Sequence, residues 1–537
     1  MRGGILRLPM DAVADLHKPF AAQARVRKPR VSADAGIKLF FGSNALVAIV
    51  VLALITIFLF REGFGFFGQN LSNIRLYRQS GLEYVDIMRK HAEAHTALSR
   101  GLSTIRLRQF RVAQNAGVPL EQINASLAPF DEFATAFSDT AEPLNGLVSD
   151  AGELASELKA QLAAAGGLIE QNMDAEESAA TDAAATAAPT AAGEMLEKLR
   201  GNTPGFETAT ATVRTQVASL LAVAPQLPDA EVQAAFAKWE TRARDYLGGL
   251  ATGVQELRAW SPEAPVPWYR AISAFLFGRD WVTASFWQDW YGIIPLFVGS
   301  VMVSIVALVF AVPLGVASAI YVSEVAAPRE RSFIKPYIEF ISASPSVVLG
   351  FFGIAVVGQA VRAASESDWF KWVSFFPLSE RLNIFTAGLL LALMAVPTIF
   401  TLSEDALRNV PRGFKEASYA LGANRLQTIA RVLVPASLSG IVSAILLGLG
   451  RVIGETMVVL LCAGNRIDIP DFTAGLGAFF QPVHTMTGII AQEMGEVVRG
   501  SIHYRALFMV GLVLFVLTLG INYCAQRLVA RYRMSIG

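Results

Sequence analysis

The sequence predicts an all-α membrane protein with six membrane-spanning helices and a large helical insertion between the first span and the second. Three observations support this fold class. Of the 537 residues, 53% are hydrophobic and only 17% are charged, and the mean hydropathy is +0.43, as is typical of membrane proteins. Six apolar runs are each long enough to cross a bilayer core of about 30 Å. A long polar stretch with apolar positions at helical spacing separates the first two runs.

The composition also excludes several functions. Net charge is zero, so charge gives no case for a nucleic-acid partner. No Gly-Lys pair occurs in the sequence, which excludes a Walker A phosphate loop within it. Cys462 and Cys524 are too few for a disulfide framework, and both lie in or at the end of apolar runs. We expect each to pack as a small apolar residue.

The N-terminal part predicts a basic tail followed by a first span. Residues 1–38 hold eight Lys or Arg residues, and the apolar run 39–60 follows them. This run and its leader are too long for a signal peptide, and the sequence Arg61-Glu62-Gly63-Phe64 is no small-residue cleavage site. We expect an uncleaved transmembrane helix with its N-terminus in the cytoplasm.

We expect residues 61–290 to form an extracytoplasmic helical domain, in the form of a long antiparallel bundle. Apolar residues recur at helical spacing around Leu82–Phe110, Leu147–Ile169 and Val213–Leu257. The segment 174–194 is almost all Ala, Thr, Asp and Glu, and its composition predicts a mobile linker.

Two further groups of residues in the insertion have specific interpretations. His91 and His95 lie one turn apart, and on an exposed helix we expect them to be solvated rather than to bind a metal. A cluster of aromatic residues near the next apolar run predicts an interfacial belt. Its members are Trp281, Phe286, Trp287, Trp290 and Tyr291.

The remaining chain, 291–537, predicts five more spans. They are Ile293–Tyr321, Tyr337–Gln359, Ile384–Leu402, Ala436–Ala463 and Ala506–Cys524. If the N-terminus is cytoplasmic, the inner segments carry 19 Lys and Arg residues and the two short outer loops carry 6. This excess matches the positive-inside rule. We therefore expect a multi-pass protein of the bacterial inner membrane with both termini in the cytoplasm.

The polar stretch 404–435 separates the fourth and fifth predicted spans. Its pattern predicts a short helix, a turn at Gly422 and a second helix that re-enters the membrane at Pro435. The sequence Lys415-Glu416-Ala417-Ser418-Tyr419-Ala420-Leu421-Gly422, with Val432-Leu433-Val434-Pro435 after it, resembles the EAA loop of ABC importer permeases. Ser418, Val432 and Val434 are mild departures from that pattern. The resemblance implies that Glu416, Ala417 and Gly422 couple the chain to a separate ATPase. The alternative is an ordinary basic loop.

Arg451 and Glu455 are charged residues inside the fifth predicted span. In a continuous helix two residues four apart share one face and lie about 6 Å apart along the axis. Ionisable groups within the membrane are costly and usually functional. An arginine fork suits a tetrahedral oxyanion, and a neighbouring carboxylate accepts a hydrogen bond from an oxyanion that keeps a proton. This favours phosphate over sulfate. The alternative is a structural ion pair that holds two helices together.

Four segments narrow the resemblance to the PstC-type permeases of phosphate ABC importers. They are Ile293-Ile294-Pro295-Leu296, Ser344-Pro345-Ser346-Val347-Val348-Leu349-Gly350-Phe351-Phe352-Gly353, Gly448-Leu449-Gly450-Arg451-Val452-Ile453-Gly454-Glu455-Thr456 and Ile489-Ile490-Ala491-Gln492-Glu493-Met494-Gly495-Glu496. The resemblance implies the type I ABC importer permease fold and assigns phosphate passage to Arg451 and Glu455. It implies no enzymatic activity and no cofactor in this chain. It also implies three kinds of partner: a PstA-like permease, a PstB-like ATPase dimer and a PstS-like phosphate-binding protein.

Three other functions stay open at this point. A permease for sulfate or molybdate would use the same architecture. A receptor-like membrane protein would explain one span followed by an external bundle, but the inner segments are too short for a signalling domain. A secondary transporter would leave the spacing of the EAA-like stretch unexplained.

Overall fold

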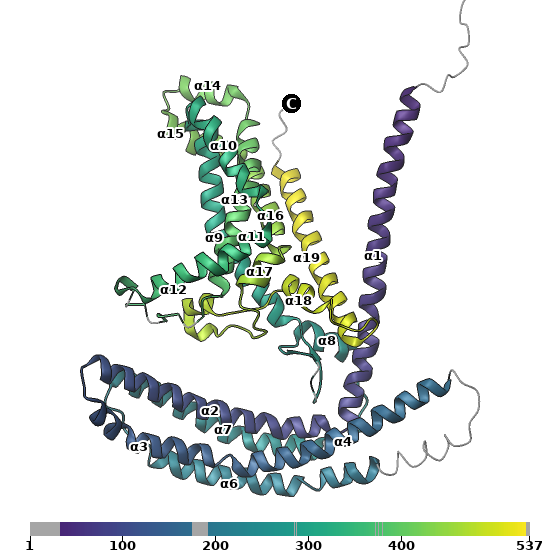
Figure 1. Ribbon diagram of the computed structural model, residues 1–537, viewed down its shortest axis with the longest axis vertical. Coiled ribbons are helices and arrows are strands. Elements are labelled where there is room, and N and C mark those ends of the chain that lie inside the picture. The colour runs from purple at the N-terminus through teal and green to yellow at the C-terminus, as the bar shows by residue number, and fades with distance from the viewer. Residues whose placement is uncertain are drawn as a thin grey trace, which may run out of the picture. The chain divides into compact units, whose positions relative to one another are not determined.

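The computed structural model describes residues 33–173, 192–283, 285, 287–370, 372–373, 375–378 and 380–532. Helices dominate these residues (Figure 1), which confirms the all-α prediction. The strands of the described part form one short antiparallel pair, β1 (Trp281–Val282) and β2 (Trp290–Tyr291). Within the described residues, six helices are long and apolar enough to span a membrane, as predicted. They are Phe40–Gln79, Ile294–Val325, Ser346–Glu366, Ile384–Arg408, Arg425–Ile453 and Ile502–Leu528.

The first helix, α1 (Ala33–Gln79), continues well past residue 60, where the sequence predicted its end. Its last turns stay helical because their side chains pack: Phe66, Ile74 and Tyr77 are buried. The helix stops at a turn that contains Gly81, whose φ is +75°. A Cβ at this position would lie 2.2 Å from the Leu199 side chain, so only glycine fits both the backbone and the space.

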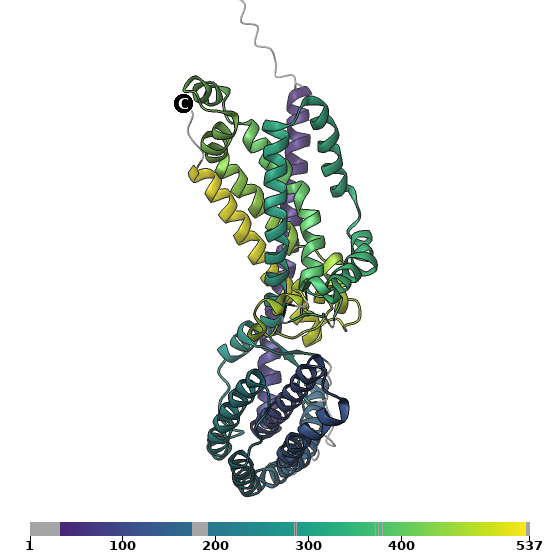
Figure 2. The ribbon, with the colours of Figure 1, turned by 90° about the vertical axis from the view of Figure 1, so that its left-hand side faces the viewer.

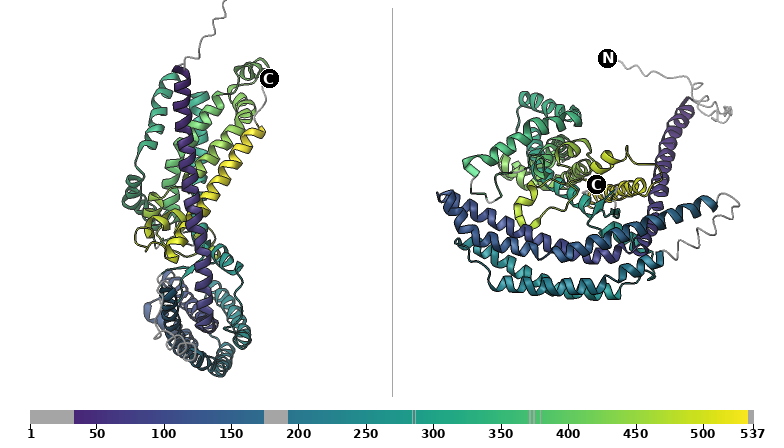
Figure 3. Two further views of the ribbon diagram at one scale, coloured as in Figure 1. Left: turned by 90° about the vertical axis from the view of Figure 1, so that its right-hand side faces the viewer. Right: turned by 60° about the horizontal axis from the view of Figure 1, so that its bottom comes forward.

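Long helices lying side by side make up the bundle within the insertion (Figures 2 and 3). They are α2 (Leu82–Asn115), α3 (Leu120–Asp139), α4 (Glu142–Met173), the helix at 192–200, α6 (Thr203–Ala222) and α7 (Ala230–Ala259). Their apolar faces meet in one aromatic-rich core, where the Phe236 and Trp239 rings stack 5.5 Å apart and Phe137 is fully buried. The predicted linker 174–194 lies mostly outside the described residues, and its last residues, 192–194, already belong to a helix.

Two carboxylates join the start of α2 to the segments around it. Glu83 accepts hydrogen bonds from Arg78 at 2.6 and 3.0 Å, from Arg270 at 3.1 Å and from the Trp260 indole at 3.3 Å. These donors belong to α1, to α8 (Tyr269–Phe277) and to the end of α7. Asp86 binds the Tyr77 hydroxyl, Arg89 and the Trp287 indole. The bundle is therefore tied to the end of α1 and to the segment that leads into α9 (Ile294–Ile320).

The predicted aromatic belt is wrong for the residues that the structure describes. Trp281 and Tyr291 are buried and pack edge to face across the β1–β2 pair, 5.5 Å apart. Trp287 and Trp290 pack against the bundle core. These rings are covered because the hairpin folds back onto helices that are distant in sequence. Phe286 lies outside the described residues.

The permease part is built around α9, α13 (Ile384–Arg408) and α16 (Val434–Ile453), which form one buried cluster. Small residues allow the close approach. Ile399 of α13 sits between Gly315 of α9 and Gly448 of α16, where an added Cβ would lie 2.9 Å and 2.8 Å from its side chain. The other helices of this part are α10 (Pro328–Ala343), α11 (Ser346–Phe352), α12 (Gly358–Glu366), α14 (Arg412–Ala420), α15 (Arg425–Thr428), α17 (Met457–Cys462), α18 (Met486–Glu493) and α19 (Ile502–Tyr532).

Two predicted spans are broken in the structure. Tyr337–Gln359 divides at Ser344, whose extended backbone (ψ 129°) precedes Pro345; a residue before proline disfavours the helical conformation. Ala436–Ala463 divides after Ile453, and α17 starts only at Met457. Among the described residues of this part are three π-helical turns, each directly after an α-helix. They are Tyr321–Val325, Gly353–Val357 and Ile429–Leu433.

Candidate functional site

Arg451 lies two residues before the end of α16, and its side chain is exposed. Its Nη1 donates a hydrogen bond to the Thr398 hydroxyl, 3.1 Å away in α13. Among the residues that the structure describes, no carboxylate pairs with this guanidinium. The sequence predicted that this residue lies inside one continuous span, Ala436–Ala463. That prediction is wrong because α16 ends at Ile453.

Glu455 lies in the break between α16 and α17 and is half-buried. Its Oε1 accepts a hydrogen bond from the Met457 amide at 3.2 Å, and its backbone carbonyl accepts one from the Thr487 hydroxyl at 2.8 Å. The two charges were expected on one face of a continuous helix. Gly454 ends that helix. Arg451 therefore lies in the last turn of α16, and Glu455 lies in the break that follows. They make no ion pair with each other in the described residues.

A small internal cavity touches Glu455. Four hydroxyl residues, Ser300, Ser304, Thr485 and Thr487, contribute to its wall together with apolar side chains of α9, α13, α16 and α17. Its volume is about 10 Å³, enough for about one water molecule. A tetrahedral oxyanion does not fit in a cavity of this size.

The polar stretch between α13 and α16 has the predicted helix–turn–helix form, made by α14 and α15. Glu416, Ala417 and Gly422 are all exposed. Gly422 has φ +82°, and nothing lies within 4 Å of an added Cβ, so the backbone conformation, and not a lack of space, favours glycine here. Ser418 is buried, and its hydroxyl lies 2.9 Å from that of Thr428. This bond explains how serine is accommodated where the EAA pattern has alanine.

Sequence reasoning missed Thr398 and Thr487, the side chains that hold Arg451 and the Glu455 backbone. Thr398 follows Pro397 inside an apolar span, and this polar residue was a usable signal. Thr487 lies in a segment distant in sequence from Glu455, and no local pattern links the two.

The two histidines were expected on an exposed helix face, but neither lies on one. His95 is fully buried, stacks on Phe137 with ring centres 4.4 Å apart and hydrogen-bonds to the Thr140 hydroxyl at 2.9 Å. Burial lowers the pKa of His95 to about 4. His91 is half-buried against Gly253, where an added Cβ would lie 2.1 Å from its ring. No group of three or more His, Cys, Asp or Glu residues within the described ranges could hold a metal ion.

The cysteines divide between two environments. Cys462 is buried in the permease core, as predicted. Cys524 is exposed on α19, so its predicted packing is not seen in this chain alone.

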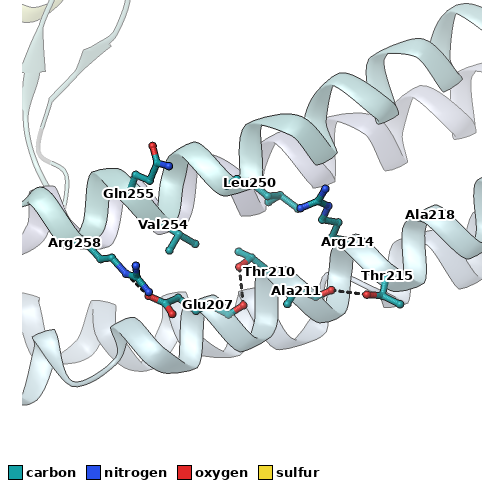
Figure 4. A pocket seen from close by; sticks show the side chains of 11 residues that line it. Glu207, Thr210, Ala211, Arg214, Thr215, Ala218, Leu250, Val254, Gln255 and Arg258 are labelled. Atoms are coloured by element: carbon teal, nitrogen blue, oxygen red, sulfur yellow. Dashed lines mark hydrogen bonds and ion pairs between the residues drawn. The ribbon is translucent and has the colours of Figure 1, made fainter.

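A groove of about 780 Å³ lies between α6 and α7 of the bundle (Figure 4). Its polar groups largely satisfy one another. Arg258 pairs with Glu207 at 2.6 Å, and the Thr210 and Thr215 hydroxyls donate to carbonyls of their own helix. All of its lining residues belong to α6 and α7.

Comparison with known proteins assigns the permease part to a family. Residues 311–534 match the model of the binding-protein-dependent transport system inner membrane component. A probable ABC transporter permease protein, YqgH of Bacillus subtilis, is 35% identical over 44% of this chain and 72% of its own length. The phosphate transport system permease protein PstC of Pasteurella multocida is 30% identical over 49% of this chain and 82% of its own length.

The bundle helices α2 to α7 lie outside the match to the family model. A structural comparison with the MetNI methionine ABC transporter gives 20% identity over 45% of this chain and 94% of that one, with a TM-score of 0.32, too low to support any inference. The sequence relatives are sufficient: the chain belongs to the family of binding-protein-dependent transport system inner membrane components and is one of its PstC-type permeases.

Proposed function

We propose that this chain is the permease subunit of an ABC importer that passes inorganic phosphate into the cytoplasm, driven by ATP hydrolysis in a separate subunit. The observation that carries the proposal is the exposed Arg451 guanidinium, held by Thr398 beside the helix break that contains Glu455. An unpaired guanidinium on a membrane helix is expensive unless it faces a polar path or a partner. The PstC relative is named as a permease protein of a phosphate transport system.

The chemistry of the two side chains favours phosphate among the oxyanions. Arginine presents several N–H donors in a planar fork, which suits two oxygens of a tetrahedral anion. Glu455 accepts hydrogen bonds when ionised and repels a fully deprotonated anion. Phosphate near neutral pH keeps at least one P–OH group, which can donate to this carboxylate. Sulfate keeps none.

The proposal includes an orientation and a set of partners. The excess of Lys and Arg puts both termini and the polar stretch 404–435 in the cytoplasm of a bacterial cell, and the bundle outside it. The exposed Glu416, Ala417 and Gly422 then form a docking surface for an ATPase dimer. A second permease subunit completes the path, and an extracytoplasmic phosphate-binding protein delivers the substrate.

Four variants test the site: Arg451→Gln, Arg451→Lys, Glu455→Gln and the double glutamine variant. A hydrogen bond to a charged group contributes about 1.5–3 kcal/mol, so we expect Arg451→Gln to lower phosphate uptake by ten- to a hundredfold at normal abundance. Lysine should restore part of the flux, because it keeps the charge but lacks the fork. Radioactive phosphate uptake and membrane abundance are measured for each variant.

The structural alternative gives a different pattern. If the charges only stabilise the fold, each single change lowers abundance, and the double change restores both abundance and uptake. That result would refute the proposed site.

A permease for sulfate or molybdate is the second candidate, since the same helices could carry another oxyanion. Competition of phosphate uptake by sulfate separates the two. We expect no competition in the wild type and measurable competition in Glu455→Gln, because an amide both donates and accepts hydrogen bonds. Strong sulfate competition in the wild type would favour the second candidate.

A further inference from the structure

The end of α9 is held by both helices of the polar stretch. Glu324 lies in the π-helical turn that follows α9, and its side chain is only 9% exposed. Lys415 of α14 pairs with its carboxylate at 2.7 Å. Arg425 of α15 donates to the Glu324 backbone carbonyl and, at 3.5 Å, to that of Val325. Lys415 and Arg425 lie about 90 to 100 residues from Glu324 in the sequence, so these are tertiary contacts.

The opposite end of α9 touches the segment that positions Glu455. An added Cβ at Gly299 would lie 2.1 Å from the His484 carbonyl oxygen, so the two backbones are in close contact. The Ser300 hydroxyl accepts a hydrogen bond from the Met486 amide at 2.9 Å. Thr487, the next residue, donates to the Glu455 carbonyl. Ser300 and Glu324 are separated by about 36 Å along a helix that rises 1.5 Å per residue.

The connection at Glu324 differs from the other connections of the polar stretch. The helices α13 and α16 are covalently joined to it, because α13 ends at Arg408 and α16 begins at Val434. No covalent connection leads from 409–433 to α9. The ion pair and the two carbonyl contacts are therefore the described polar links between this stretch and α9.

We infer that the Lys415–Glu324 ion pair transmits movement of the polar stretch to α9, and through α9 to the segment that holds Glu455. The pair is a positioning device, and the inference rests on the proposed function. A mostly buried carboxylate that loses its partner is destabilised. The end of α9 then keeps its apolar contacts with Ile429 and Leu433 but loses its fixed position relative to α14. Nucleotide hydrolysis is therefore converted less efficiently into passage of the substrate.

The experiment uses the complete transporter in proteoliposomes, with ATP hydrolysis and phosphate uptake measured in the same sample. Lys415→Met and Glu324→Gln break the pair, Lys415→Arg keeps the charge, and Lys415→Glu with Glu324→Lys exchanges it. Arg408→Met is the matched control. It removes a basic residue that contacts Glu404 at 3.5 Å, while Arg331 and Lys335 still hold that carboxylate.

We expect the two disrupting variants to hydrolyse about tenfold more ATP per phosphate transported, within the five- to 150-fold range of ordinary coupling between sites. Lys415→Arg and Arg408→Met should stay within about twofold of the wild type, and the exchanged pair should recover most of the loss. Unchanged ratios in the disrupting variants would overturn the inference. Loss of the ATPase from the purified complex would overturn it too, because the pair would then serve docking. A wild-type complex that transports no phosphate would instead refute the proposed function.

Discussion

The bundle and the permease helices bury their apolar surface in different ways. The bundle encloses its aromatic rings: Phe137, Phe206 and Phe236 are fully buried within the chain itself. The permease encloses only part of its apolar surface. The most apolar windows of the second and fourth spans are 56% and 61% buried, whereas those of the third and sixth are 17% and 22% buried. The bundle therefore buries these rings within one chain, whereas the permease leaves much of its apolar surface to be covered by lipid and by other subunits.

The largest expected effect concerns the surface at Gly422 that we propose as the docking site of the ATPase. Gly422→Arg should reduce phosphate uptake by more than about a hundredfold while abundance stays normal, because a side chain at φ +82° strains the turn and a bulky one blocks docking. Gly422→Asn is the control, since asparagine tolerates this backbone region. Uptake in the membrane vesicles is the measurement. Normal uptake by the arginine variant would mean that nothing docks at this turn.

The next prediction concerns the aromatic core of the bundle. Phe236→Ala should destabilise the bundle by about 3–5 kcal/mol, the usual cost of removing a buried ring. The abundance and orientation of the permease helices should not change. Limited proteolysis of the two parts, followed by mass spectrometry, measures this. If the permease helices become equally sensitive to protease, the two parts fold as one cooperative unit.

The buried His95 makes the stability of the bundle depend on pH. Its pKa is lowered to about 4 in the folded state, against about 6.5 in an unfolded chain. Between these values the unfolded state binds more protons, so the free energy of unfolding falls as the pH falls. The full loss, about 3 kcal/mol, is reached below about pH 4.

His95→Gln should remove this part of the pH dependence, because glutamine does not titrate. Thermal unfolding of the detergent-solubilised protein between pH 7 and pH 4, compared between variant and wild type, checks it. Parallel curves for the two proteins would contradict the assignment to His95.

Thr487 tests the permease core at a single hydrogen bond. Thr487→Val removes the donor to the Glu455 carbonyl and should lower uptake about fivefold, equivalent to a net hydrogen bond of about 1 kcal/mol. Thr487→Ser keeps the donor and serves as the control. Equal uptake by the two variants would show that the Glu455 backbone needs no such support.

The smallest effect is expected from removing the bundle. The Arg78 side chain donates to the Ala264 carbonyl at 3.0 Å, so the residues on either side of segment 80–262 lie close together. A short Gly-Ser linker can therefore replace that segment. A cut at Ser72 and Pro265 would instead remove Ile74 and Tyr77, which are buried. Trp287 should be changed to Ser in the shortened chain, because its bundle contacts are lost. Uptake by intact cells should stay within about threefold. Complete loss with the shortened protein still inserted would make the bundle essential.

Local patterns predicted most of the fold. Spans, the helix–turn–helix stretch and the helical insertion follow from hydropathy and periodicity, which depend on neighbouring residues. The break at Ser344 was also visible, since Pro345 follows it. The break at Gly454 was not, because membrane helices often contain glycine and the apolar run continues to Ala463.

The site shows the same limit. Arg451 and Glu455 were identifiable as charges in an apolar run, but their relation depended on whether that run was one helix. The hydroxyls of Thr398 and Thr487 come from other elements, and so do the helices against which the β1–β2 hairpin packs. Contacts of this kind are set by packing, and no spacing rule in a single sequence encodes them.

The π-helical turn Ile429–Leu433 has a consequence for the azimuth of Arg451. Such a turn accommodates one residue more than an α-helical turn does, and each residue of an α-helix rotates the chain by about 100°. Deleting one residue from this turn would leave an ordinary α-helical turn, and the side chains of α16 would keep their directions relative to α14. Deleting one residue from the α-helical part of α16 before Arg451 would instead turn Arg451 by about 100° about the helix axis and away from Thr398. The π-helical turn is therefore a point in this helix where the chain length can change by one residue while Arg451 stays beside Thr398.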